Sequence, residues 1–209
     1  PIQLKQNWVT ISWAMESLVL FWIGIKIRHS YIRKAGMIVG FLSLAKLVFI
    51  DYPYNPYNYN YSNYAFILNE RMFTYSAVVA ALFAAGWLYK KYKDEISPDE
   101  RILSTVFVIL ANGVLLIQLS IESQAYFSHI AYVKTMLLGL AEKSNEFRRA
   151  FQSAYTSLFS ARQLSISVLW IIYALMTITI GIYKKFRALR LMALVLFGHG
   201  GCYSVYGGY

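Results

Sequence analysis

The sequence predicts an all-α fold, a polytopic transmembrane helical bundle of about six spans built from helical hairpins. Of the 209 residues, 58% are hydrophobic and only 14% are charged. A soluble domain carries about 25% charged and 45–50% apolar residues. The positive mean hydropathy of +0.45 likewise indicates a chain that lies in lipid. Six stretches approach the roughly 20 apolar residues that a helix needs to cross about 30 Å of hydrocarbon.

The predicted spans cover residues 8–27, 35–50, 72–89, 102–121, 164–183 and 189–205. A soluble helical bundle is the alternative, but its helices show a polar face at every turn. Residues 78–88 and 105–119 contain almost no polar side chains. We treat 1–209 as one transmembrane domain. Because the chain begins at Pro1 without an initiator Met, we expect it to be a segment of a longer chain.

The position of the basic residues explains the net charge of +10. Twelve of the 20 Lys and Arg residues lie in the three short connections after the first, third and fifth spans. The positive-inside rule places these connections in the cytoplasm and both ends of the segment outside it. We therefore expect a multi-pass protein of the bacterial inner membrane, with membrane lipids as partners and no nucleic acid.

Two connections are expected on the extracytoplasmic side. Residues 51–64, DYPYNPYNYNYSNY, contain six Tyr, which suit the membrane interface. An alternative role for this stretch is a surface that binds sugars. The connection 122–163 has apolar residues at helical spacing on both sides of a charged stretch, so we expect two amphipathic helices there.

The first and fifth spans end alike. WIGIKIRHSYIR, residues 22–33, aligns with TIGIYKKFRALR, residues 179–190. In both, a hydrophobic helix ends in Ile-Gly-Ile, and an Arg opens the next apolar run nine residues after the Gly. This pattern indicates a duplicated hairpin in parallel orientation.

Polar side chains inside the spans are candidates for function, because they are costly in lipid. Glu16 lies about 12 Å into the first span and Lys46 lies about 6 Å from the outer end of the second. We expect these opposite charges to be able to pair. The other candidates for binding a substrate or ion are Asn69, Arg71, Asn112, Ser120 and Glu122, with Asp51 at the border of the same face. The alternative is that these groups only hold helices together.

Four stretches resemble the bacterial predicted-membrane-protein family known as domain of unknown function 2339. They are residues 13–28 with WAMESLVLFWIGIKIR, 67–91 with an Asn-x-Arg entry, 111–122 with ANGVLLIQLSIE, and the hairpin 167–198. The resemblance implies a long inner-membrane protein of repeated hairpins, and it implies no activity for single residues. After Gly198 the chain departs from the family pattern, and we hypothesise that this tail comes from a frameshift or a truncated reading frame.

The leading interpretation is a protein of envelope transport or assembly with a polar site on the extracytoplasmic half. The alternatives are a membrane-embedded enzyme acting on lipid-linked sugars or acyl groups, and a structural scaffold. The partner would then be an envelope glycan or a lipid-linked substrate. No cofactor or metal is expected, because the sequence has no Gly-rich phosphate loop, no His and Cys metal spacing and no Gly-x-Ser-x-Gly elbow. The oligomeric state and any catalytic residue stay open.

Overall fold

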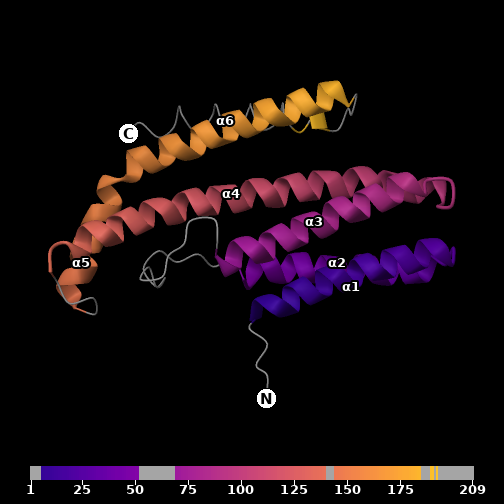
Figure 1. The fold of residues 1–209 in the computed structure, drawn as a ribbon, viewed down its shortest axis with the longest axis horizontal. Coiled ribbons are helices and arrows are strands. Elements are labelled where there is room, and N and C mark those ends of the chain that lie inside the picture. The colour runs from indigo at the N-terminus through magenta and orange to yellow at the C-terminus, as the bar shows by residue number, and fades with distance from the viewer. Residues whose placement is uncertain (1–5, 52–68, 140–143, 185–188, 191, 193–209) are drawn as a thin grey trace, which may run out of the picture. The chain divides into compact units, whose positions relative to one another are not determined.

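The computed structural model describes residues 6–51, 69–139, 144–184, 189–190 and 192. Every regular element in these ranges is helical, which confirms the predicted fold class (Figure 1). The elements are α1 (Gln6–Lys26), α2 (Ser30–Phe49), α3 (Glu70–Lys91), the 3-10 helix η1 (Pro98–Glu100), α4 (Ile102–Met136), α5 (Asn145–Ser157) and α6 (Phe159–Tyr183).

The chain divides into two compact units. Unit 1 comprises Pro1–Pro53 and Leu68–Leu115, and unit 2 comprises Tyr54–Ile67 and Leu116–Tyr209. α4 is continuous across the boundary, so its first part belongs to unit 1 and its second part to unit 2. The single transmembrane domain stays a prediction.

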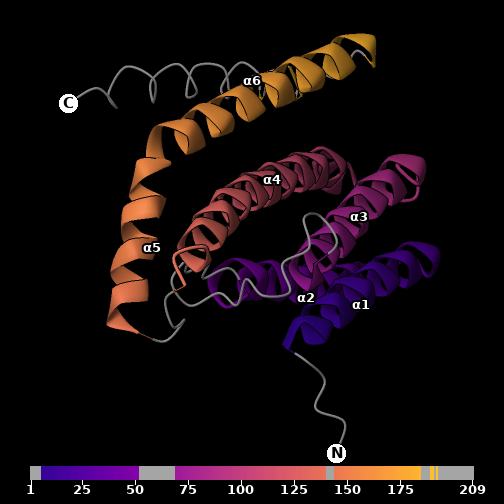
Figure 2. The same cartoon turned by 60° about the vertical axis from the view of Figure 1, so that its left-hand side comes forward.

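Unit 1 is built on the hairpin of α1 and α2, and α1 also packs against α3 (Figure 2). The hairpin turn is tight, because Arg28 adopts a left-handed conformation with φ 57° and the His29 amide donates to the Gly24 carbonyl at 2.9 Å. Gly36 and Gly40 of α2 face α1, where a Cβ on Gly40 would lie 2.7 Å from Ser17 Oγ. Small residues four apart allow such a close approach of two membrane helices.

The core of unit 1 contains three mutually packed aromatic rings from three helices. Phe21 of α1, Tyr89 of α3 and Phe107 of α4 have ring centroids 5.2–5.6 Å apart. All three are buried. Tilted and edge-on pairs at this spacing add attraction beyond burial alone. The rings therefore hold α4 against the hairpin.

Unit 2 contains the second half of α4, α5 and α6. Ser144 caps α5 by accepting from the Phe147 amide at 3.0 Å, and Phe147 and Phe151 pack on Ala131 of α4. α5 is thus one amphipathic helix, as predicted. The other predicted amphipathic helix is not separate, because α4 continues without a break to Met136. Its 35 residues span about 52 Å, well beyond a hydrocarbon core of about 30 Å.

Four helical segments are long and apolar enough to cross a membrane: Asn7–Lys26, Glu70–Lys91, Pro98–Met136 and Phe159–Tyr183. The chain is accordingly a membrane protein. α2 carries Arg33, Lys34 and Lys46 and is not among the four, so the span at 35–50 stays a prediction. The predicted sixth span and the Tyr-rich stretch 51–64 lie almost wholly outside the described residues.

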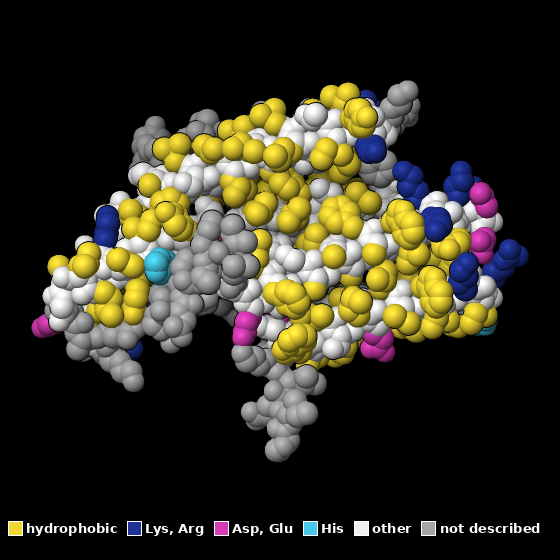
Figure 3. Space-filling view, viewed as in Figure 1, with side chains coloured by type: hydrophobic (Ala, Val, Ile, Leu, Met, Phe, Trp, Pro, Cys, Tyr) yellow, Lys and Arg dark blue, Asp and Glu magenta, His cyan; other side chains and the backbone are white. Residues whose placement is uncertain are grey.

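The surface of unit 1 fits a lipid environment. Large apolar side chains are widely exposed, including Trp22 at 51%, Phe41 at 70% and Trp87 at 57%. Figure 3 shows apolar side chains over much of the visible face, while Lys and Arg gather at the end where the α1–α2 and α3–α4 connections lie. A monomeric soluble protein rarely exposes such a contiguous apolar surface.

Candidate functional site

Lys46 belongs to a polar cluster where α1 begins and α2 ends. Its ammonium lies 2.9 and 3.0 Å from the two carboxylate oxygens of Asp51 and donates to Thr10 Oγ1 at 2.7 Å. Thr10 in turn donates to Asp51, and Ser43 Oγ donates to the Thr10 carbonyl at 3.0 Å. The Lys46 and Asp51 side chains are only 10% and 5% exposed. The two charges neutralise each other inside the unit.

Arg33 forms a second buried cluster at the opposite end of α2. Its Nε donates to Glu100 Oε2 at 2.7 Å and its Nη1 donates to the Gly24 carbonyl at 3.1 Å. Ser30 Oγ donates to the other oxygen of Glu100 at 3.2 Å. The Arg33 and Glu100 side chains are 5% and 13% exposed. Arg33 of α2 thus contacts the α3–α4 connection through an ion pair and α1 through a hydrogen bond.

The Arg33 cluster depends on a glycine. A Cβ on Gly24 would lie 2.6 Å from Arg33 Cγ and 2.9 Å from its backbone nitrogen, so any larger residue would displace the arginine. The same contact recurs in unit 2, where a Cβ on Gly181 would lie 3.0 Å from Arg190 Cγ and 3.2 Å from its nitrogen. This shared local geometry supports the predicted duplication of the hairpin.

Glu16 does not pair with Lys46, contrary to the sequence-based expectation. It is exposed on α1, and it makes no hydrogen bond or ion pair with any residue that the structure describes. The expectation was wrong because it compared depth only. Lys46 has its carboxylate partner five residues later, in Asp51.

Three other candidates take part in hydrogen bonds within or between helices. Asn69 caps α3 by accepting from the Met72 amide at 2.7 Å. Asn112 donates to the Val108 carbonyl within α4 at 2.7 Å. Ser120 donates to the Leu116 carbonyl and accepts from Trp170 Nε1 at 3.0 Å, which joins α4 to α6.

Arg71 is half-buried on α3 and Glu122 is buried on α4, and each takes part in further interactions. Ser120 and Glu122 belong to unit 2, whereas the other five candidates belong to unit 1. Their convergence on one polar site stays a prediction.

Sequence reasoning missed the groups that carry the buried ion pairs. Arg33 was counted only among the connection bases, and Thr10 and Glu100 were not singled out. Two signals could have identified them: the nine-residue Gly-to-Arg spacing that occurs twice, and the four acids, Asp94, Glu95, Asp99 and Glu100, in an otherwise basic connection. Buried bases need such partners.

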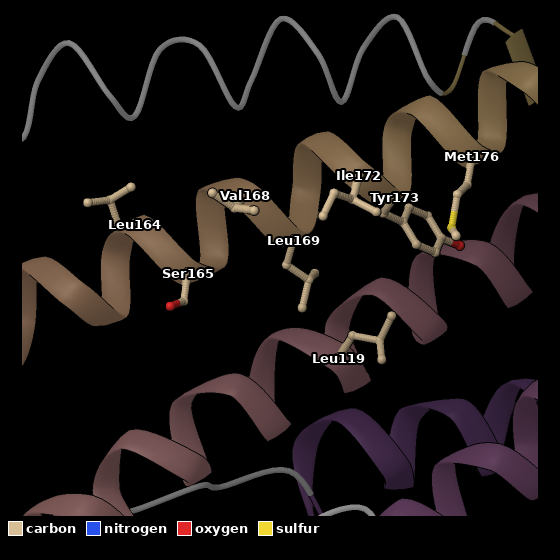
Figure 4. Close-up of a pocket in the computed structure, with 8 residues that line it drawn as sticks. All are labelled: Leu119, Leu164, Ser165, Val168, Leu169, Ile172, Tyr173 and Met176. Atoms are coloured by element: carbon tan, nitrogen blue, oxygen red, sulfur yellow. The ribbon is translucent and has the colours of Figure 1, made fainter.

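Each unit has an apolar hollow. In unit 1 a cavity of about 250 Å³ lies among α1–α4, and its lining includes Phe21, Leu82 and Phe107. The two serines in its lining, Ser17 and Ser43, donate to the carbonyls of Gly36 and Thr10. In unit 2 a shallow groove of about 490 Å³ follows α6, with Leu119 of α4 facing it (Figure 4). The groove is lined by apolar side chains together with Ser165 and Tyr173.

No group of three or more His, Cys, Asp or Glu residues that could hold a metal occurs within the described part of the chain. Comparison with known proteins adds no assignment: no family model, curated protein or solved structure matches the chain. The resemblance to the family of domain of unknown function 2339 therefore stays a prediction.

Replacing Glu100 by Gln should destabilise the protein by about 3 kcal/mol, because it leaves the Arg33 guanidinium buried without its counter-charge. Glu95→Gln is the matched control: Glu95 lies 3.9 Å from Arg28, whose side chain is 73% exposed. Its loss should cost less than about 0.5 kcal/mol. Equilibrium unfolding of the full chain in mixed micelles measures both. If the two variants lose the same free energy of unfolding, the Arg33–Glu100 ion pair stabilises the protein no more than the exposed Arg28–Glu95 pair does.

Lys46→Met should cost about 3 kcal/mol, since the buried Asp51 carboxylate loses its cation. Adding Asp51→Asn removes that charge and should restore most of the loss. The same unfolding assay on both single variants and the double variant gives the coupling energy. If the loss of stability in the double variant equals the sum of the two single losses, Lys46 and Asp51 are not coupled and the account of this cluster is wrong.

Proposed function

We propose that the chain is an assembly module of a membrane complex, in which the exposed face of α1 receives a transmembrane helix of a partner protein. One observation carries this proposal: Glu16 is an exposed carboxylate in a membrane-spanning helix, without a partner in the described part of the chain. The proposal refines the assembly role that the sequence suggests.

Glu16 lies at the centre of its span. It follows Asn7 by nine residues and precedes Lys26 by ten, so it is about 14–15 Å from each end of a span whose hydrocarbon core is about 30 Å thick. An acidic side chain at that depth costs about 2.5–3.5 kcal/mol on insertion scales. A partner that donates a hydrogen bond or a positive charge offsets this cost.

The residues around Glu16 form a face suited to a helix. Ser12 precedes it by one turn, and Met15 and Val19, both 50% exposed, flank it. Trp8 and Trp22, 50% and 51% exposed, lie at the two ends of the same face. Spacings of three and four residues place these side chains on one side of α1. We expect the partner helix to present a Lys, Arg, Asn or Gln near the membrane centre.

The transport and enzyme alternatives receive less support. Both need a polar group that faces a cavity, whereas the cavity of unit 1 is apolar and its two serines already donate to carbonyls. Lys46 is held by Asp51 and Thr10. For the orientation, the gathering of bases at the α1–α2 and α3–α4 connections supports a cytoplasmic position of these connections in the inner membrane.

Replacing Glu16 by Leu should weaken the complex while leaving the chain folded. An interhelical polar contact is worth about 0.6–2 kcal/mol, so we expect the association to weaken about three- to thirty-fold. Glu16→Gln retains hydrogen bonding and should weaken it less. The size of the complex extracted from native membranes, measured by native gel and mass photometry at several dilutions, reports the change.

Ile38→Leu is the matched control, because it changes an exposed apolar side chain on α2, outside this face of α1, without altering charge. A complex of unchanged size in Glu16→Leu would contradict the assembly role. Loss of a proton-coupled phenotype in Glu16→Gln, with the complex intact, would favour transport instead.

A further inference from the structure

The two Gly–Arg contacts differ in one respect. In unit 1, Arg33 lies against Gly24 and pairs with the carboxylate of Glu100. In unit 2, Arg190 lies against Gly181 in the same way, yet it has no ion pair or hydrogen bond within the described ranges. Arg190 is half-buried, so its guanidinium is held by packing but remains accessible.

The aligned sequences show which positions differ between the two copies of the hairpin turn. Gly181 and Arg190 follow Gly24 and Arg33 by 157 residues each. At the same offset, Lys184 replaces Ile27 and Arg187 replaces Ser30, the residue that donates to Glu100. The second copy thus has bases at two positions where the first has an apolar residue and a neutral donor, and Tyr183 where the first has Lys26, so it carries one base more. A single carboxylate needs only one guanidinium, whereas several bases suit the oxygens of a phosphate.

The position of Arg190 along the chain is also suited to contact with a lipid headgroup. α6 is a membrane-spanning helix that ends at Tyr183, whose side chain is 83% exposed, and the Lys184 ammonium lies 5.6 Å from that ring. An exposed Tyr followed by bases is typical of the membrane interface, where lipid phosphates lie.

From these observations we propose that the guanidinium of Arg190, positioned by its contact with Gly181, binds the phosphate of an anionic lipid headgroup. The phosphate takes the place that the Glu100 carboxylate has in the first hairpin. The leaflet is the one that faces the basic connections.

Native mass spectrometry of the full chain in nanodiscs of phosphatidylcholine with increasing phosphatidylglycerol gives the affinity for the anionic lipid. Arg190→Gln should weaken phosphatidylglycerol binding about ten-fold, the effect of one lost charge-assisted contact. Gly181→Ala keeps every charge but brings a Cβ to about 3.0 Å from Arg190 Cγ. It should also weaken binding, about three-fold or more.

Lys184→Gln is the control, because it removes one exposed base next to the contact; it should weaken binding less than about two-fold. Equal weakening by Arg190→Gln and Lys184→Gln, with no effect of Gly181→Ala, would indicate diffuse attraction and overturn the proposal. So would a wild-type chain with no preference for phosphatidylglycerol. If Arg190→Gln lowers the unfolding stability equally with and without the anionic lipid, the partner is a protein carboxylate and the proposal fails.

Discussion

The α1–α2 hairpin depends on the neutralisation of two basic residues within one helix. Arg33 and Lys46 are 13 residues apart in α2, about 20 Å along the helix, and their side chains are only 5% and 10% exposed. A buried cation without a counter-charge costs several kcal/mol, and removing one member of such a pair is strongly destabilising. Glu100 and Asp51 supply the counter-charges. Without these two carboxylates, α2 could not lie against α1 with its charged side chains inward.

Each pair also fixes geometry. Arg33 reaches Glu100 only because Gly24 lets its backbone come close to α1, and Glu100 sits in the connection that leads into α4. The ion pair thus ties the hairpin to the helices that follow. Asp51 is brought back to Lys46 by the end of α2 itself, where the amides of Ile50 and Asp51 donate to the Lys46 carbonyl at 2.9 and 3.0 Å. The polar side chains of Arg33 and Lys46 therefore stabilise the packing of unit 1, whereas Glu16 forms no hydrogen bond or ion pair with any described residue.

The helices could be predicted from the sequence because apolar stretches of sufficient length leave few alternatives in lipid. Two features could not. The sequence predicts a span at 102–121 followed by separate amphipathic helices, but α4 continues through the residues that follow to Met136. The sequence offers Glu16, at a neighbouring depth in the adjacent helix, as a partner for Lys46, yet the partner is Asp51, just beyond the end of α2.

The Gly–Arg contact, in contrast, could be anticipated from the spacing of these residues in the sequence. The alignment of residues 22–33 with 179–190 predicts a duplicated hairpin, and the structure has the same glycine-to-arginine contact in both copies. What the alignment does not show is the counter-charge, because Glu100 comes from a distant connection. Local patterns of this kind identify where a helix turns back, whereas the identity of a long-range partner depends on tertiary packing.

We propose that α2 crosses the membrane because its two bases, Arg33 and Lys46, are neutralised by Glu100 and Asp51. Single cysteines at Lys34 and at Ile50, both exposed and near opposite ends of α2, test it in a Cys202→Ser background with a membrane-impermeant maleimide applied to either side of sealed vesicles. We expect the two positions to be labelled from opposite sides. Labelling of both from the same side would place α2 along one membrane surface and contradict the account.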